Sequence, residues 1–371
     1  MHRTLILLLL LILFTHRAGA APAYELDTVA DGLDRPWCVA FLPDGELLVT
    51  ERPGNLKRIS ADGTVTAISG VPPVYFAPSG QSGLFDVLVD PGFADNRTIF
   101  LVYAHGDRGA NATRVARARL TGDALEALEV IFTVEPTKRL PQHFGGKLIF
   151  LPDGTLLLTT GEGFNYREAA QDTYSLLGKT VRIHTDGSIP EDNPFTDGIA
   201  GHPAVWTYGH RNPQGLAYDP VSGTVWAHEH GPRGGDELNV ILPGTNYGWP
   251  AITYGMDYSG AYVSPFTEHP GMAQPVRYWV PSIAPSGLAV YHGDAFPAWQ
   301  GSLLVGALVD KVVYRISFDA EIIRQEPLFE ELESRIRDVR VAADGSIYLV
   351  TDGEGGRVVR VRAASVPGDA P

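Results

Sequence analysis

The hydrophobic pattern of the chain is a repeated pair of short apolar segments joined by a polar turn that contains Asp-Gly. The first unit runs through 39–41, turns at Pro43-Asp44-Gly45 and continues in 47–50. Clear relatives and looser ones recur along the chain, at 148–159, 339–351, 87–102, 216–226 and 288–305. Apolar runs of this length bounded by such turns predict paired β-strands. The chain therefore holds about six similar units.

This repetition predicts an all-β six-bladed β-propeller with four-stranded antiparallel blades. Each unit is followed by further strand-like segments such as 56–59 and 312–316, which supply the remaining strands of a blade. A ring of blades covers both faces of every sheet without long exposed edges. A β-sandwich would also show short strands, but it would not explain units recurring roughly every fifty to seventy residues. The longest segment with a helical pattern is 124–130, and no linker divides the chain.

The first twenty residues have the pattern of a signal peptide. A short basic start precedes an apolar run over 5–14 and the small residues Ala18-Gly19-Ala20. A membrane anchor is the alternative, but Thr15, His16 and Arg17 interrupt the run before the ~20 residues that crossing needs. We expect 1–20 to be removed and 21–371 to form a single domain in the periplasm or outside the cell, with no membrane span.

The charge of the chain indicates which kinds of partner it can bind. The formal net charge of -14 argues against nucleic acid, which is bound mainly through clustered Lys and Arg. An uncharged partner fits better. The single cysteine, Cys38, cannot form an internal disulfide and lies in an apolar stretch, so we expect it to be a buried core residue. The oligomeric state is left open.

Polar and Gly-rich segments join the repeats, and loops of this kind carry the specialised residues of a strand scaffold. They are 79–84, 142–147, 208–215 with 229–237, and 335–339. At these segments the chain resembles the PQQ-dependent aldose sugar dehydrogenases, the soluble quinoprotein glucose dehydrogenase family. The resemblance covers nearly all of the chain after residue 20 and includes, in order, GQSGLF, QHFGGKLIF, LGKTVRIHTDGSIPEDNPF, YGHRNPQGLA, EHGPRGGDELN, NYGWP and RIRDV.

The resemblance implies oxidation of aldose sugars at the anomeric carbon, with hydride passing to pyrroloquinoline quinone (PQQ) and then to an external electron acceptor. His143 matches the family's catalytic histidine, and a neutral imidazole suits the base that takes the hydroxyl proton. Taken alone, His143 could equally end a strand. Glu162 is a candidate to orient His143 by accepting its other ring proton, although an exposed turn carboxylate is the plainer interpretation.

PQQ is an acidic quinone, so its pocket must supply positive charge. Arg211 is implied as both a catalytic and a cofactor contact. The other cofactor contacts that the resemblance implies are Gln81, Asn212, Tyr258, Arg335 and Arg337, with the backbone of Ala307, Leu308 and Val309. Arg335 and Arg337 alternate along a predicted strand, which puts both side chains on one face.

Calcium is also implied, because in the family the carbonyls of a Gly-Pro step hold the catalytic ion against the quinone. That step is Gly231-Pro232 here. By the same resemblance Glu237 and the Tyr247 carbonyl hold a second calcium. Ca²⁺ accepts ~6–8 oxygen ligands, backbone carbonyls included. Ordinary loop acids are the alternative interpretation of Glu237 and its neighbour Asp236.

The chain departs from the family in one loop. The glucose dehydrogenases place a lysine against the cofactor where this chain has Val309, and Lys311 lies two positions further on. Two other classes share the predicted architecture. Calcium-dependent sugar lactonases hydrolyse lactones without a quinone, and some propellers only bind a protein or glycan.

Overall fold

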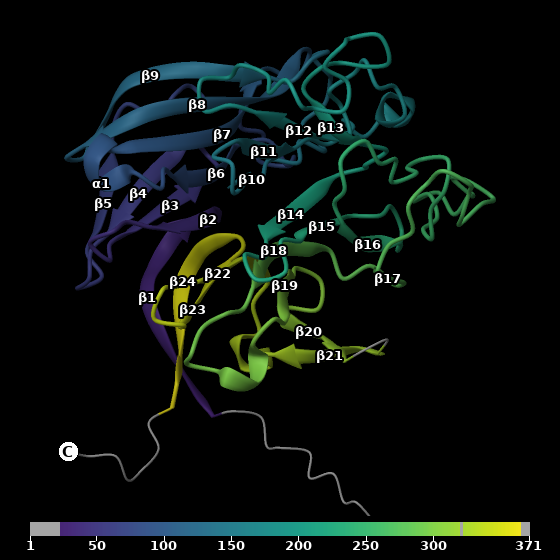
Figure 1. The fold of residues 1–371 in the computed structure, drawn as a ribbon. Helices are drawn as coiled ribbons and strands as arrows, with labels where there is room; N and C mark the ends of the chain where they lie inside the picture. The colour runs from purple at the N-terminus through teal and green to yellow at the C-terminus, as the bar shows by residue number, and fades with distance from the viewer. Residues whose placement is uncertain (1–22, 320–321, 365–371) are drawn as a thin grey trace, which may run out of the picture.

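The computed structural model describes residues 23–319 and 322–364 and is a ring of six β-sheets around a central axis (Figure 1). Every sheet has four antiparallel strands, which confirms the predicted six-bladed β-propeller. No helix among the described residues is long and apolar enough to cross a membrane. The predicted signal peptide, 1–20, lies outside these residues.

The blades follow one another along the chain, and in each the first strand is the innermost. Blade 1 consists of β2 (Pro36–Phe41), β3 (Leu47–Glu51), β4 (Asn55–Ile59) and β5 (Val65–Ile68), and blade 2 of β6 (Leu84–Val89), β7 (Thr98–Gly106), β8 (Asn111–Thr121) and β9 (Ala124–Thr133). Blade 3 consists of β10 (Leu148–Phe150), β11 (Leu156–Thr159), β12 (Lys179–Ile183) and β13 (Val205–Tyr208), and blade 4 of β14 (Pro213–Tyr218), β15 (Val225–Glu229), β16 (Asp236–Val240) and β17 (Arg277–Trp279). Blade 5 consists of β18 (Pro285–Val290), β19 (Leu303–Ala307), β20 (Val313–Asp319) and β21 (Ile322–Leu328). The only helices among the described residues are short: α1 (Phe93–Asn96), η1 (Arg167–Ala170), η2 (Pro297–Trp299) and η3 (Glu330–Leu332).

The sixth blade joins the two ends of the chain. Its inner strands are β22 (Ile336–Val341), β23 (Ile347–Thr351) and β24 (Glu354–Ala363), and its outer strand is β1 (Tyr24–Asp34). β1 pairs with β24 from Tyr24 opposite Ala363 to Asp34 opposite Glu354. Figure 1 shows the purple N-terminal strand beside the yellow C-terminal one. The ring is therefore closed by strands from opposite ends of the sequence.

The repeated Asp-Gly turns connect the two inner strands of a blade. Gly45 has a φ of 87°, a conformation that glycine adopts without strain, and the Asp44 carboxylate accepts the Glu46 N–H at 3.2 Å. The strands on either side bury their apolar side chains between blades. All six predicted units are the first two strands of a blade.

The helical pattern at 124–130 was misleading, since this segment lies in β9. β9 pairs with β8 through a bulge, with Glu129 opposite Arg117 and Glu126 opposite Arg119. Ala127 takes a φ of 50° within it. An extra residue shifts the alternation of a strand, so the apolar spacing imitated that of a helix.

A second kind of bulge recurs where the innermost strand begins. The register shifts between its first and third or fourth residues in five blades, in β2, β6, β14, β18 and β22. A bulge at a strand end re-aims a side chain. The start of an inner strand and the end of its antiparallel neighbour also lie at the same end of the ring, so the loops there can meet around the axis.

Candidate active site

A cavity of about 240 Å³ lies at this end of the ring. Five of the six blades contribute to its wall, which consists of Trp37, Arg52, Gly80, Gln81, Gln214, His230, Ala284, Leu308, Arg335, Arg337 and Asp352. Four of these residues were predicted from the sequence as cofactor contacts: Gln81, Leu308, Arg335 and Arg337. A larger hollow of about 470 Å³, between blades 3 and 4, contains none of the predicted site residues.

Arg335 and Arg337 face the same side, as their spacing predicted, and both bind Asp352. Arg335 Nε lies 2.9 Å from Asp352 Oδ2, and Arg337 Nη2 lies 3.1 Å from Asp352 Oδ1. Burial raises the pKa of the Asp352 carboxyl, but the two guanidinium groups outweigh it and bring the pKa to about 2. Asp352 is therefore ionised at neutral pH and fixes both arginines in the cavity wall.

His143 and Glu162 form a buried pair. His143 lies immediately upstream of blade 3 and Glu162 follows β11, so the antiparallel pairing of β10 and β11 brings them together. His143 Nδ1 lies 2.7 Å from Glu162 Oε1, and both side chains are buried. The interpretation of Glu162 as an exposed turn acid is thus wrong.

The environment of this pair disfavours charge on both groups. Burial lowers the pKa of the His143 imidazole well below 6.5, and the positive charges of Arg211 and Lys138 lower it further. Burial also raises the pKa of Glu162 from 4.5 to about 7, against the opposing charge of Arg211. An imidazole kept neutral, with a carboxylate on one nitrogen, has the protonation state that a general base needs.

The loop that carries His143 is held by two predicted cofactor contacts. The Gln81 side-chain oxygen accepts the His143 N–H at 2.8 Å, and the Asn212 side-chain oxygen accepts the Gly145 N–H at 3.1 Å. His143 has a φ of 50°, which is unusual for a residue other than glycine. A Cβ on Gly161 would lie 2.4 Å from the His143 carbonyl carbon, so only glycine permits this approach. Gln81 and Asn212 therefore fix the position of the imidazole.

Arg211 connects the His143 side of the site with the Gly-Pro loop. Its Nη1 donates to the Gly231 carbonyl at 2.6 Å and to the His230 carbonyl at 3.1 Å. Its guanidinium carbon lies 5.4 Å from the Trp249 ring centroid and 5.9 Å from that of Tyr258. The Tyr258 ring is 59% exposed and stacks against Phe164, whose edge contacts the His143 ring. Phe164 thus borders the imidazole, and Tyr258 links it to Arg211.

The Gly231-Pro232 loop is tightly folded around a buried carboxylate. Asp236 accepts the N–H of Gly231 at 2.9 Å and those of Ile283 and Ala284 at about 3 Å. A Cβ on Gly231 would lie 2.2 Å from the Gly234 carbonyl oxygen. The Gly231 and Pro232 carbonyls are therefore held by a rigid backbone, as an ion site built from carbonyls requires. Asp236 is a structural anchor of this loop.

Glu237 faces a second carboxylate. Glu237 on β16 lies directly opposite Glu229 on β15, and side chains of opposed residues share one face of a sheet. Burial and the Glu229 charge raise the pKa of Glu237 to about 8. Glu229 also binds His210, whose ring stacks on Tyr247 at 4.7 Å. A buried carboxyl, Glu229, facing a half-buried one, Glu237, suits a cation, although no group of three or more acidic, His or Cys side chains in the described part of the chain is spaced to hold a metal by itself.

The end of β19 and the loop after it contain Val309, at the position where the glucose dehydrogenases have a lysine. Ala307 and Leu308 are buried, and the Leu308 carbonyl accepts Arg335 Nη1 at 3.2 Å. Val309 is 54% exposed, and Lys311 is exposed and absent from the cavity wall. Lys311 therefore does not supply the charge that is missing at Val309.

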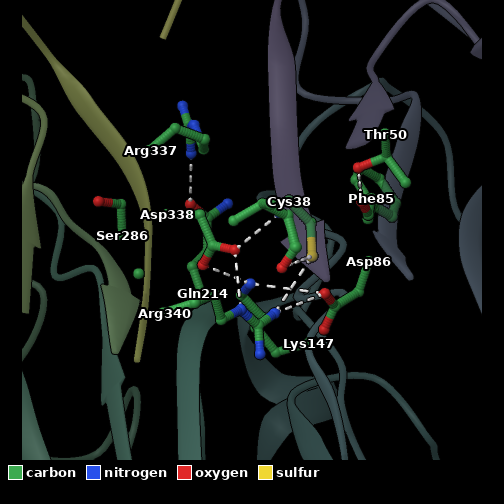
Figure 2. A network of polar contacts seen from close by, with 12 residues as sticks. Cys38, Thr50, Phe85, Asp86, Lys147, Gln214, Ser286, Arg337, Asp338 and Arg340 are labelled. Atoms are coloured by element: carbon green, nitrogen blue, oxygen red, sulfur yellow. Dashed lines mark hydrogen bonds and ion pairs between the residues drawn. The ribbon is translucent and has the colours of Figure 1, made fainter. Parts of the chain in front are cut away.

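Figure 2 shows a charge cluster of largely buried side chains beside Arg337. Lys147, from blade 3, crosses the axis to bind Asp338 of blade 6 at 2.9 Å. Arg340 bonds Asp338 and Asp86, each at 2.9 Å, and reaches Cys38 Sγ at 3.2 Å. Two cations and two carboxylates balance one another here, and Cys38 is buried as predicted. We call Asp86, Lys147, Asp338 and Arg340 the axial cluster. Its four members come from blades 2, 3 and 6, and the contact with Cys38 adds blade 1, directly beside Arg337.

Sequence reasoning missed several residues of the wall: Trp37, Arg52, Gln214, His230 and Asp352. Three wall residues, Trp37, Gln214 and Arg337, occupy the bulge at the start of an inner strand. Arg52 and Asp352 directly follow the second strand of their blades, and His230 does so in blade 4. These residues therefore share equivalent positions within the repeat.

Comparison with known proteins agrees with this arrangement. A family model described as Glucose / Sorbosone dehydrogenase matches residues 33–360. Aldose sugar dehydrogenase YliI of Escherichia coli (strain K12) is 41% identical, covering 97% of this chain and 99% of its own. Quinoprotein glucose dehydrogenase B of Acinetobacter calcoaceticus is 27% identical, covering 90% and 86%.

Solved structures extend the similarity to three dimensions. The apo-form of the soluble aldose sugar dehydrogenase from Escherichia coli has a TM-score of 0.88 at 40% identity, covering 92% of this chain and all of its own. The PQQ-bound form of aldose sugar dehydrogenase from Streptomyces coelicolor has a TM-score of 0.74 at 30% identity, covering 92% and 99%.

Proposed function

Because the chain belongs to the glucose/sorbosone dehydrogenase family, we propose that it oxidises soluble aldose sugars at the anomeric carbon to lactones, using PQQ and Ca²⁺. The relatives described above are named as sugar dehydrogenases, one of them a quinoprotein and one solved with PQQ bound. The observation that carries the proposal is the buried His143–Glu162 pair beside a cavity lined by arginines.

His143 is the general base in this proposal. Glu162 accepts the Nδ1–H, so Nε2 carries the lone pair that takes the proton of the anomeric hydroxyl. Glu162 then stabilises the imidazolium that forms, and Gln81 keeps the His143 backbone in place. A base positioned in this way contributes ~10²–10⁴-fold to the rate.

The cavity fits an acidic, planar cofactor. Three arginines and one carboxylate line it, and Arg52 Nε is buried without a hydrogen-bond partner. When bound, PQQ supplies the electron acceptor for the hydride that leaves the sugar. Arg335 and Arg337 would hold its acidic groups, while Arg211, Asn212 and Tyr258 would contact it from the side of His143. The backbone from Ala307 to Val309 would complete the contacts.

The donor groups for calcium also fit. The Gly231 and Pro232 carbonyls belong to a rigid loop, and hard oxygen donors are what Ca²⁺ accepts. A second ion beside Glu237 and the Tyr247 carbonyl would neutralise the Glu237–Glu229 pair. The first ion would act as a Lewis acid next to the cofactor, and the second would stabilise blade 4.

We further propose that 1–20 is a signal peptide and that 21–371 works as one domain in the periplasm or outside the cell. An external electron acceptor would then reoxidise the cofactor. Family membership and the soluble relative from Escherichia coli support this location.

Reconstitution tests the proposal. The cofactor-free protein is mixed with PQQ and Ca²⁺, and reduction of an artificial dye is measured over a panel of aldoses. We expect His143→Asn to lower kcat by about 10²-fold or more while the absorption spectrum of bound quinone persists. Asparagine is chosen because it tolerates the positive φ at this position.

His184→Ala is the matched control, since His184 is exposed in a turn away from the site. It should leave turnover within twofold of the unmodified chain. Absence of dye reduction with every aldose would contradict the proposal. Hydrolysis of sugar lactones with Ca²⁺ alone would instead identify a lactonase.

A further inference from the structure

One arginine of the cavity wall, Arg52, has no assigned role. It follows β3 in blade 1 and lines the cavity together with Gln81, Arg335 and Arg337. Its backbone is fixed on both sides, because its N–H donates to the Arg35 carbonyl at 3.0 Å and its carbonyl accepts the Leu84 N–H at 3.0 Å.

The charges of the cavity do not balance. Its wall contains three guanidinium groups and a single carboxylate, Asp352, and no Lys or Glu. Asp352 is already shared by Arg335 and Arg337. Within the described residues, no carboxylate lies within 4 Å of Arg52. The cavity thus carries an excess of about two positive charges, one of them without any counter-ion.

The contacts of Arg52 orient it without neutralising it. Nη2 donates to the Gly80 carbonyl at 2.6 Å and to the Ser82 carbonyl at 3.3 Å, and the guanidinium lies over the Phe76 ring. Nε is buried with no partner among the described residues. Burial and the nearby charge of Arg337 lower the pKa of Arg52 to about 10. A partly buried guanidinium is costly unless an anion pairs with it.

We propose that Arg52 is a third arginine that binds a carboxylate of the cofactor, an inference that rests on the proposed use of PQQ. Its fork of N–H groups matches the geometry of a carboxylate, and its fixed backbone holds that fork toward the cavity. This chain needs the positive charge of Arg52 in the cavity, because Val309 and Lys311 bring no charge to the wall.

The test measures binding rather than turnover. Cofactor-free protein with excess Ca²⁺ is titrated with PQQ, and quenching of tryptophan fluorescence reports the dissociation constant, since Trp37 lies in the cavity wall. Loss of one charge-assisted hydrogen bond predicts that Arg52→Met raises the dissociation constant about 10- to 100-fold. Arg52→Lys keeps the charge but loses the fork, so its dissociation constant should lie between those of the unmodified chain and Arg52→Met.

Arg35→Met is the matched control. Arg35 faces the same Phe76 ring at 5.9 Å but pairs with Asp34 at 2.7 Å and does not line the cavity. It should change the dissociation constant less than threefold. The trimethyl ester of PQQ provides a second control, because it lacks the carboxylate charges. The unmodified chain and Arg52→Met should bind the ester with equal affinity.

Each outcome separates the two proposals. If the unmodified chain binds no PQQ, the proposed function fails. If it binds PQQ and Arg52→Met binds equally well, only the role of Arg52 is overturned. Equal weakening toward PQQ and its ester would also overturn that role, since it would show a general distortion of the cavity.

Discussion

Replacing Glu162 by Gln tests the pairing on which the proposed chemistry depends. The substitution keeps the size of the side chain and removes its charge 2.7 Å from His143 Nδ1. When Glu162 is protonated, its hydroxyl donates to Nδ1, so the ring proton moves to Nε2 and the base is blocked. We therefore expect kcat/KM of the unmodified chain to fall as the pH drops below about 7, the pKa to which burial raises Glu162. Glu162→Gln should lose this acid limb and about 10²-fold in kcat.

The raised pKa of Glu162 also determines how much this residue changes the free energy of unfolding with pH. The rise from 4.5 to about 7 corresponds to about 3 kcal/mol, at about 1.4 kcal/mol for each tenfold change in proton affinity. Because the pKa is raised in the folded state, this stability is present below about pH 4.5 and is lost as the pH rises through about 7. Glu162→Gln has no such carboxylate. It should therefore gain about 3 kcal/mol relative to the unmodified chain between pH 4.5 and pH 8.

Urea unfolding of both cofactor-free proteins across this pH range measures the difference, and the pH profile of dye reduction measures the activity. Titrating groups remote from the His143–Glu162 pair are common to both chains and cancel in the comparison. A stability difference that stays constant with pH, together with an unchanged acid limb in Glu162→Gln, would refute the reasoning.

Three other outcomes follow from the site. Arg337→Ala should raise the PQQ concentration needed for half-maximal activity by about tenfold or more, because it removes a charged donor from the cavity; an unchanged requirement would exclude that contact. Ca²⁺ should raise the melting temperature of the unmodified chain, and Glu237→Gln should reduce this effect by relieving the repulsion with Glu229; equal responses in calorimetry would argue against an ion there. Lys147→Met should destabilise the chain by about 3–5 kcal/mol in urea unfolding, because Asp338 would lose a buried partner, and a loss below 1 kcal/mol would show that the axial cluster tolerates an unpaired charge.

The architecture could be predicted because short sequence patterns specify its strands and turns. Pairs of short apolar segments joined by polar turns recur in every part of the chain, three of them with Asp-Gly, so six units imply six blades whatever their loops contain. The exception was 124–130, where a bulge at Ala127 altered the apolar spacing of a strand. Periodicity cannot separate a bulged strand from a short helix.

The site could be predicted only where residues belong to recognisable blocks. His143 and Arg337 stand in such blocks, whereas Arg52 and Asp352 each follow a strand in an ordinary sequence context. Their positions in the cavity wall depend on how six blades meet at the axis, which no local pattern specifies. The axial cluster was missed for the same reason, since Lys147 and Asp338 are 191 residues apart in the chain.

The pairing of β1 with β24 has a consequence for biosynthesis. β1 finds its neighbour only after β24 has been synthesised, so blade 6 remains incomplete while the other five blades are made. Arg335, Arg337 and Asp352 belong to that blade, and the cavity wall is unfinished without them. Binding of the proposed cofactor must therefore await the synthesis of β24, and a chain truncated within β24 would be unable to retain it.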